Sequence, residues 1–101
     1  RMLAAEVDVA FALALEAVDL SAMVWRESRG VVAAVSARGA VGLCQVMPAY
    51  SRFSARELSN PWINLWACVE ARAYWKRHCG VRWRAGYRQG WKGCKKWTQR
   101  S

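Results

Sequence analysis

The sequence predicts an all-α fold, and three observations support this prediction. Residues 3–16 are dense in alanine and leucine, which are strong helix formers. The pair Asn60-Pro61 precedes apolar residues at helical spacing. No run of alternating apolar and polar residues is long enough for a convincing β-strand. With 101 residues, of which 54% are apolar, the chain has the size and composition of a single domain with a core, spanning 1–101.

The first half of the chain predicts two helices and a loop. A helix over Leu3–Glu16 is apolar on nearly all sides, so we expect it to be largely buried. Asp19 suits the N-cap of a second helix over Leu20–Ser28, and Gly30 suits a left-handed stop after it. The small residues and glycines of 31–42 predict an irregular connection.

The second half starts with a short predicted helix over Leu43–Tyr50, in which Pro48 cannot lie deep inside. The clearest helix of the chain follows the Asn60 cap, because Pro61 at the first helical position loses no hydrogen bond. Basic residues near its end suit the helix dipole, and Gly80 terminates it. Its apolar residues at helical spacing are Trp62, Leu65, Trp66, Val69 and Ala73.

Residues 81–101 form a basic, tryptophan-rich C-terminal segment. We expect a short helix over Trp83–Gln89 and an irregular tail after it. The net charge of the chain is +9, and residues 51–101 hold twelve of the 16 basic side chains against two acidic ones. This asymmetry indicates a polyanionic partner, which could be nucleic acid, an anionic membrane or an acidic cell envelope.

Six of the seven tryptophans divide into two groups. Helical spacing predicts core positions for Trp62 and Trp66, and Trp25 is expected in the core beside Glu27. The second group alternates with Arg and Lys, so its rings either stack on sugars or bases or fold back on the body of the protein. The same mixture resembles membrane-active amphipathic segments. This group contains Trp83, Trp91 and Trp97.

The apolar segment Met2–Leu20 has the look of a signal peptide or a membrane span. It contains four acidic residues, which neither kind of segment tolerates, so we interpret it as a core helix. We see no signal peptide in this chain and expect any export to use another route. Arg1 ahead of Met2 is typical of a processed or recombinant start.

Four cysteines allow three disulfide connectivities, and free buried thiols are an equally good interpretation. No C-x-x-C pair occurs, and a single histidine, His78, gives little support for a zinc site. Among the pairings we favour Cys79 with Cys94, because this bond would tie the basic tail to the preceding helix. The remaining cysteines are Cys44 and Cys68.

Glu27 lies at the C-terminal end of a predicted helix, where the dipole disfavours a carboxylate by a few tenths to about 1 kcal/mol. Desolvation by apolar neighbours such as Trp25 acts in the same direction. Both effects favour the protonated carboxyl that a general acid needs near neutral pH. The alternative is a solvated surface glutamate paired with Arg26 or Arg29.

Three motifs follow one another along the chain. Glu27-Ser28 is followed by Ser-Ala-Arg-Gly-Ala-Val-Gly-Leu-Cys-Gln-Val-Met-Pro over 36–48, and by Asn-Pro-Trp-Ile-Asn over 60–64. Together they resemble the lytic transglycosylases with the SLT fold, which is similar to goose-type lysozyme. That family has Glu-Ser, then Ser-x-x-Gly-Ala-x-Gly-Leu-x-Gln-x-x-Pro, then Asn-Pro-x-x-Asn. The match runs from about Ala22 to Gly80, and it implies a small lysozyme-like helical domain of a compact, phage-type member.

The resemblance implies a role for each matching residue. Glu27 would be the single catalytic acid/base. Tyr87 would contact the catalytic carboxyl, although Arg88 stands where the family's Tyr-Asn-x-Gly motif has Asn. Cys44 likewise stands where the family commonly has Met. The implied substrate-binding residues are Ser28, Ser36, Gly42, Gln45 and Tyr87, with Gly39, Ala40 and Gly42 in a tight loop near the glycan.

The resemblance also implies a reaction. Ordinary glycosidases use two carboxylates, and no motif here marks a second. In the family, Glu27 would protonate the oxygen of the MurNAc-β-1,4-GlcNAc bond, the substrate's N-acetyl carbonyl would stabilise C1, and Glu27 would then deprotonate the C6 hydroxyl to form 1,6-anhydro-MurNAc. This reaction needs no metal or cofactor.

The expected partner is the glycan strand of peptidoglycan, without nucleic acid, and the expected state is a monomer. The basic C-terminal segment would reach an anionic envelope, either lipopolysaccharide or a membrane surface. We expect the protein in the bacterial periplasm or cell wall, or in a virion as a phage lysis protein.

Three functions stay open at this point. The first is a lytic transglycosylase, and the second is a goose-type-like lysozyme that hydrolyses the same bond. The third is a basic envelope- or nucleic-acid-binding module on a degenerate lysozyme fold. Loss of the carboxylate would favour the third, but Glu27 is present.

Overall fold

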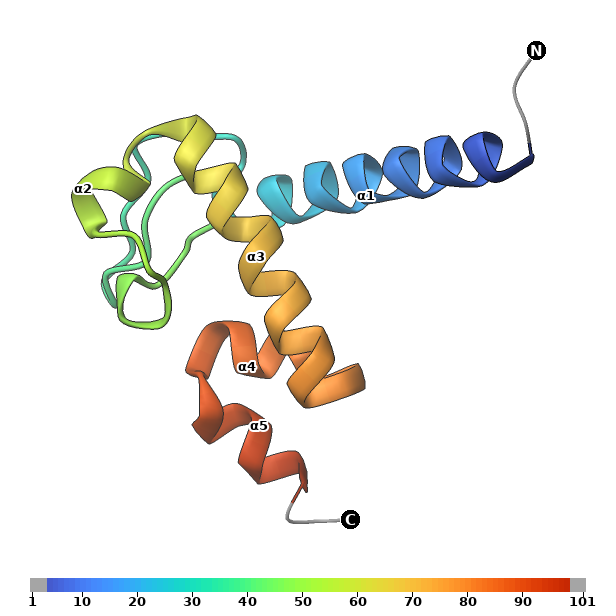
Figure 1. Ribbon diagram of the computed structural model, residues 1–101. Coiled ribbons are helices and arrows are strands. Elements are labelled where there is room, and N and C mark those ends of the chain that lie inside the picture. The colour runs from blue at the N-terminus through green and yellow to red at the C-terminus, as the bar shows by residue number, and fades with distance from the viewer. Residues whose placement is uncertain (1–3, 99–101) are drawn as a thin grey trace.

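The computed structural model describes the backbone of residues 4–98 and the side chains of residues 16–94. Within this range the chain forms helices and loops without a β-strand, so the all-α prediction is confirmed (Figure 1). No helix among the described residues has the length and apolar character needed to cross a membrane. The α-helices are α1 (Ala4–Ser28), α2 (Ala55–Leu58), α3 (Pro61–Cys79), α4 (Trp83–Gln89) and α5 (Trp91–Thr98), with 3-10 turns at Pro48–Tyr50 and Gly80–Arg82.

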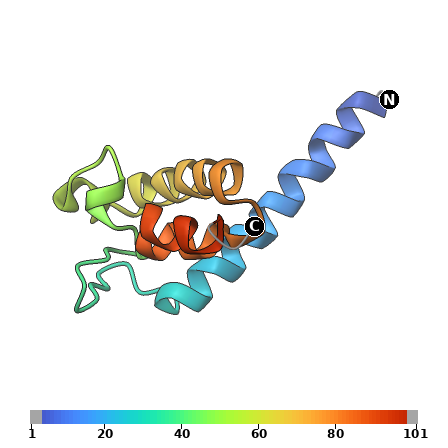
Figure 2. The ribbon, with the colours of Figure 1, turned by 90° about the horizontal axis from the view of Figure 1, so that it is seen from below.

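The first helix is continuous, and the predicted break at Asp19 is wrong. No glycine or proline lies between Glu16 and Leu20, so nothing interrupts the hydrogen bonds of the helix. The helix ends where Arg29 and Gly30 adopt positive φ angles of 57° and 80°, as predicted for the stop at Gly30. Its N-terminal half projects away from the other helices (Figure 2). The predicted burial of 3–15 lies outside the described side chains.

A buried arginine joins α1 to α3. Arg72 is almost fully buried, and its guanidinium forms ion pairs with Glu16 and, at 3.7 Å, with Asp19. Asp19 therefore acts inside the helix as an acceptor for Arg72 and not as a cap. The Arg72 guanidinium also lies 5.7 Å from the ring centre of Trp83, so α4 contacts the same cation.

The segment between α1 and α3 contains several tight turns. Its loop character over 31–42 is confirmed, but the predicted helix over Leu43–Tyr50 shrinks to the 3-10 turn that Pro48 begins. Gln45 adopts a positive φ of 52°, and Val41 pairs with Val46 through two backbone hydrogen bonds of 3.0 Å. A tight antiparallel turn replaces the helix there. We did not predict α2, although its complete capping box between Ser54 and Glu57 follows a pattern that can be read from the sequence.

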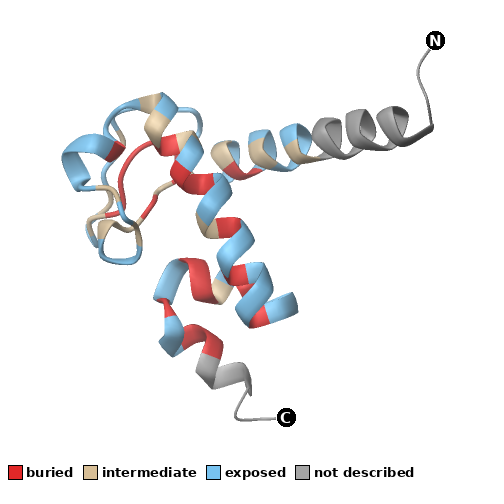
Figure 3. Cartoon of the chain, in the orientation of Figure 1, coloured by how far each residue is buried: buried red, intermediate tan, exposed pale blue. Residues whose placement is uncertain are grey.

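The predicted start and end of α3 are confirmed. The Asn60 side chain accepts hydrogen bonds from the backbone N–H groups of Trp62 and Ile63, at 2.9 and 3.2 Å. The helix ends at Gly80, whose φ is 54°. In Figure 3, buried segments alternate with exposed ones along α3. The buried residues are Asn64, Ala67, Cys68, Arg72, Trp75 and Cys79.

Three tryptophans predicted in the core lie instead on the surface. Trp62 is 79% exposed, Trp66 62% and Trp25 60%. The reason for the first two is the register of α3, which is set by buried Asn64. A residue two positions away points about 200° around the helix, and therefore outward. Trp25 likewise faces away, because Met23 occupies the buried side of α1.

The C-terminal segment is helical to Thr98, so the predicted irregular tail is wrong. Two disulfides are present, Cys44–Cys68 and the predicted Cys79–Cys94, which excludes free thiols at these positions. The second bond fixes α5 against the end of α3. Trp83 is folded back and buried, Trp91 is partly exposed, and the side chain of Trp97 lies outside the described residues.

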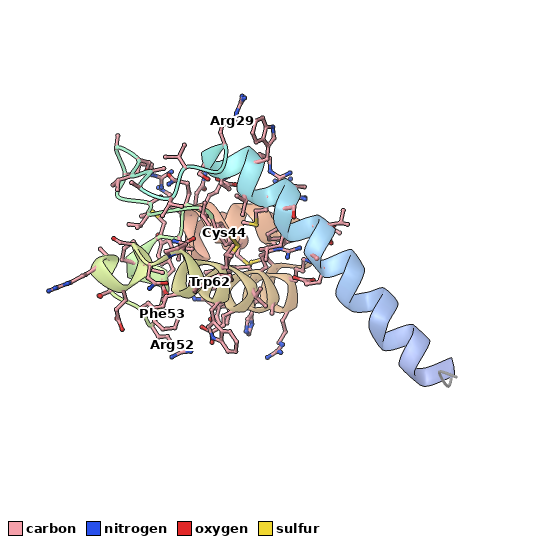
Figure 4. The ribbon with its side chains drawn as sticks, turned by 90° about the horizontal axis from the view of Figure 1, so that it is seen from above. Arg29, Cys44, Arg52, Phe53 and Trp62 are labelled. Carbon is pink, nitrogen blue, oxygen red and sulfur yellow. A yellow bond between two sulfur atoms is a disulfide. The ribbon has the colours of Figure 1, made fainter. Side chains whose placement is uncertain are left out.

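One buried carboxamide connects three parts of the chain. Asn64 is fully buried, and its Oδ1 accepts a hydrogen bond of 2.9 Å from the Cys44 N–H. Its Nδ2 donates to the carbonyl oxygens of Val41 at 2.8 Å and Leu58 at 2.9 Å. These three bonds attach the loop and the end of α2 to α3. Figure 4 shows Cys44 between the ribbons of α1 and α3.

We predict that Asn64→Ala lowers the free energy of unfolding by about 3 kcal/mol or more, because it removes three buried hydrogen bonds and leaves the Cys44 N–H and the Leu58 carbonyl without partners. Asn60→Ala is the matched control and should cost only about 1 kcal/mol through loss of the cap. Urea unfolding followed by circular dichroism measures both. Equal losses for the two variants would contradict the role given to Asn64.

Candidate active site

Glu27 is the second-to-last residue of α1, and its side chain is only 15% exposed. It opens into a cleft of about 170 Å³ between the end of α1, the loop over 36–47 and α4. The cleft brings together four of the residues singled out from the sequence, namely Glu27, Ser36, Gln45 and Tyr87. Its other lining residues are Arg38, Ala40, Met47 and Arg88.

The loop that forms one wall of the cleft is held by its own polar side chains. The Ser36 hydroxyl accepts hydrogen bonds from the N–H groups of Arg38 at 3.2 Å and Ala40 at 3.0 Å. The Gln45 side-chain amide donates to the carbonyl oxygens of Ala34 at 3.1 Å and Gly42 at 3.0 Å. Ser36 and Gln45 therefore shape the wall as well as line it.

Two other predicted site residues lie beside the cleft and do not line it. The Ser28 hydroxyl donates to the Val24 carbonyl at 3.2 Å and accepts from the Gly30 N–H at 3.1 Å. These bonds close the end of α1 directly after Glu27. Gly42, with a φ of 76°, lies against the Asn64 side chain. Both residues support the geometry of the cleft, and their contact with the glycan stays a prediction.

Tyr87 lies on the inner side of α4, where it is buried. Its hydroxyl donates a hydrogen bond of 2.9 Å to the carbonyl oxygen of Cys44, and the described residues show no hydrogen bond from it to the Glu27 carboxyl. Burial raises the pKa of Tyr87 well above its usual range, and the negative charge of Glu27 adds to the rise. The phenol therefore stays protonated and acts as a hydrogen-bond donor.

Arg88 is the side chain that contacts Glu27. Its guanidinium lies 3.5 Å from the Glu27 carboxylate, and it is itself more than half exposed at the mouth of the cleft. This is the position at which the resemblance led us to expect Asn. The chain thus places a charged partner next to its central carboxylate, and a second cation, Arg38, lines the same cleft.

Arg38 and Met47 were not selected from the sequence, because both occupy variable positions of the second motif. A usable signal for Arg38 existed in principle. Ionisable side chains gather at functional sites, so a cation inside the second motif is a candidate neighbour of Glu27. Met47 has no such signal, since apolar residues before a proline are common in any loop.

A larger hollow of about 330 Å³ lies elsewhere on the molecule. It is lined by apolar side chains such as Val24, Leu43 and Leu65, together with Trp25, and contains no titratable group. This hollow therefore offers no acid–base group, unlike the smaller cleft at Glu27. Among the described residues, no three His, Cys, Asp or Glu side chains gather in a way that could hold a metal ion.

The comparison with protein families decides the class of the protein. The family described as Transglycosylase SLT domain matches residues 12–101. The chain belongs to the transglycosylase SLT family. The resemblance seen in the three motifs is thus confirmed, and this SLT domain is a peptidoglycan-degrading enzyme of the transglycosylase type. Neither the curated proteins nor the solved structures gave a match.

We predict that Gly42→Ala destabilises this SLT domain much more than Gly39→Ala. Both glycines have positive φ angles, 76° and 88°, so either substitution costs about 1 kcal/mol of backbone strain. A Cβ added at Gly42 would lie 2.9 Å from the Asn64 Cγ and 3.1 Å from the Leu58 carbonyl oxygen, whereas a Cβ added at Gly39 would meet nothing within 4 Å. Thermal unfolding should therefore show a clearly lower midpoint for Gly42→Ala. Equal midpoints would mean that the close approach to Asn64 is unimportant.

Proposed function

We propose that this domain cleaves the β-1,4 bond between N-acetylmuramic acid and N-acetylglucosamine with Glu27 as the single general acid/base, leaving 1,6-anhydro-MurNAc ends. The observation that supports this most directly is the composition of the cleft. Glu27 is the only carboxylate among the described residues that line it. A hydrolase with two catalytic carboxylates would need a second one within about 5–10 Å, on the other side of the scissile bond.

The first step uses Glu27 as an acid. The protonated carboxyl donates its proton to the glycosidic oxygen, and the C1–O bond of MurNAc breaks as the GlcNAc hydroxyl leaves. The N-acetyl carbonyl oxygen of the same MurNAc attacks C1 and stabilises its positive charge as a cyclic oxazolinium. The substrate therefore supplies the nucleophile that the cleft lacks.

The second step uses the same residue as a base. The Glu27 carboxylate accepts the proton of the MurNAc C6 hydroxyl, the oxygen attacks C1, and the bond to the acetamido oxygen breaks. The 1,6-anhydro ring closes, and Glu27 regains its proton for the next cycle. Arg88, 3.5 Å away, orients the carboxylate, and Tyr87 holds the loop at Cys44 in register with α4.

We predict that Glu27→Gln lowers the rate of peptidoglycan cleavage by at least about a hundredfold, because the amide can neither donate nor accept the proton. Turbidity loss of purified cell walls measures the rate. Glu57→Gln is the matched control and should keep full activity, since Gln also serves in a capping box and Glu57 lies on α2, away from the cleft. Full activity in Glu27→Gln would contradict the acid/base assignment.

We predict that the products carry anhydro ends. Mass spectrometry of muropeptides from digested peptidoglycan distinguishes these from reducing ends by the mass of one water. Anhydro-MurNAc ends are expected because the C6 hydroxyl, and not water, attacks C1. Reducing ends would show that the domain is a lysozyme that hydrolyses the same bond.

We further propose that the domain works at the cell wall, in the periplasm or as part of a virion, and that its basic C-terminal segment favours an anionic envelope. The support is electrostatic. Residues 81–101 contain no acidic side chain, and four of their basic residues, Arg82, Arg84, Arg88 and Lys92, are exposed. Such a surface would raise the local concentration of the enzyme near lipopolysaccharide or anionic lipid, in a manner that salt weakens.

A further inference from the structure

The outer face of α3 carries a row of exposed aromatic side chains. Trp62 and Trp66 are 79% and 62% exposed, and Tyr74, two turns further along, is 41% exposed. These residues recur every fourth position with Glu70 between them, so they lie on one side of the helix at steps of about 6 Å. We call Trp62, Trp66, Glu70 and Tyr74 the aromatic stripe.

The stripe and the catalytic cleft lie on different faces of the molecule. Asn64, Cys68 and Arg72 form the buried side of α3, and each stripe residue is two positions from one of them, or about 200° around the helix. No stripe residue lines the cleft. In Figure 4, Trp62 and Arg52 lie on the side opposite Arg29, which directly follows the end of α1.

The middle of the stripe offers hydrogen-bonding groups beside the rings. Glu70 accepts bonds from the Arg52 guanidinium at 3.1 and 3.0 Å and from the Trp66 indole N–H at 2.9 Å. The hydrogen bonds from Arg52 lower the pKa of Glu70 most, and the bond from Trp66 adds to this effect. The Arg52–Glu70 pair is therefore ionised and electrically balanced. A hollow of about 190 Å³ opens next to it, lined among others by Tyr50, Ser51 and Trp75.

The far end of the stripe is rigid. The Tyr74 ring meets Trp75 edge-on at 4.9 Å and Trp91 at 6.0 Å between ring centres, and His78 lies 4.4 Å from it. Aromatic pairs in this arrangement are favourable beyond their buried area. The exposed face of Tyr74 is therefore presented in a fixed orientation, and little conformational entropy is lost when something packs on it.

We propose that the aromatic stripe is a second, non-catalytic binding surface for a peptidoglycan glycan strand. A pyranose ring has C–H groups on its faces and hydroxyl or amide groups on its edges. Aromatic rings suit the faces, and the Arg52–Glu70 pair supplies both donors and acceptors to the edges. The spacing of the rings is comparable to the advance of one sugar unit along a β-1,4-linked chain. The inference rests on the proposed function only in taking peptidoglycan as the substrate.

Other occupants fit the stripe less well. An anionic membrane would have to desolvate the Arg52–Glu70 ion pair in the centre of the aromatic row, which is costly. A second copy of the chain would favour a continuous apolar patch, whereas this row is interrupted by an ion pair after two turns. The glycan is the partner that uses the aromatic and the ionic side chains together.

The test is co-sedimentation of the full chain with insoluble peptidoglycan, in the Glu27→Gln background so that the polymer is not digested. We expect Trp62→Ala combined with Trp66→Ala to weaken binding at least about tenfold, because a rigid body that engages the polymer on two faces loses its avidity when one face is removed. Trp25→Ala is the matched control, since Trp25 is 60% exposed on α1 and outside the stripe; its binding should change less than about twofold.

Thermal unfolding midpoints identify a folding defect, which is not expected because both stripe tryptophans are largely exposed. Unchanged sedimentation of the double variant would overturn the proposal. So would a selective loss of binding to phosphatidylglycerol vesicles, or a change from dimer to monomer in analytical ultracentrifugation, with peptidoglycan binding intact. The cleavage assay with Glu27→Gln reports separately on the proposed function, so either hypothesis can fail without the other.

Discussion

The geometry of the cleft depends on the burial of one side chain, the carboxamide of Asn64. It satisfies backbone groups of the loop at Val41 and Cys44 and the last carbonyl of α2 at Leu58. Buried backbone groups without partners are costly, so the loop has one favourable position against α3. Gly42 follows from the same constraint, because a larger residue would occupy the space that the carboxamide needs. The wall that faces Glu27 is thus fixed by a contact outside the cleft.

A domain of this size has a thin core, and covalent bonds compensate for it. Each of the two disulfides has one of its cysteines on α3. One joins Cys68 to Cys44 beside the Asn64 contact, and the other joins Cys79 to Cys94 in α5. Cross-links over 24 and 15 residues reduce the entropy of the unfolded chain and hold the loop and the C-terminal helix on α3.

The two faces of α3 serve different ends. The inner face positions the loop, α1 and α4 around Glu27, and the outer face exposes aromatic rings to the solvent. Exposed tryptophans add nothing to the core, so their position calls for a partner. At the cleft itself, the replacement of the expected Asn by Arg88 puts a cation at the entrance. This side chain contacts Glu27, the only carboxylate among the described residues that line the cleft, and Arg38 lines the same cleft.

The helical class, the α3 boundaries from Asn60 to Gly80 and the stop at Gly30 follow from local signals in the sequence, because caps, glycines and spacing act locally. The Cys79–Cys94 pairing is one of several alternatives that the sequence allows. The family followed from three ordered motifs, and four of the predicted site residues do meet in one cleft. Only the tertiary structure decided what depends on distant partners. Asp19 stays inside α1 with Arg72 as its partner, the Cys79–Cys94 bond and Trp91 packing accompany a helical α5, and Asn64 sets which side of α3 is inward. The spacing of apolar residues could not predict that Asn64, and not Trp62, lies in the core. The Asn64 carboxamide is stable there only because three backbone groups from elsewhere in the chain form hydrogen bonds with it.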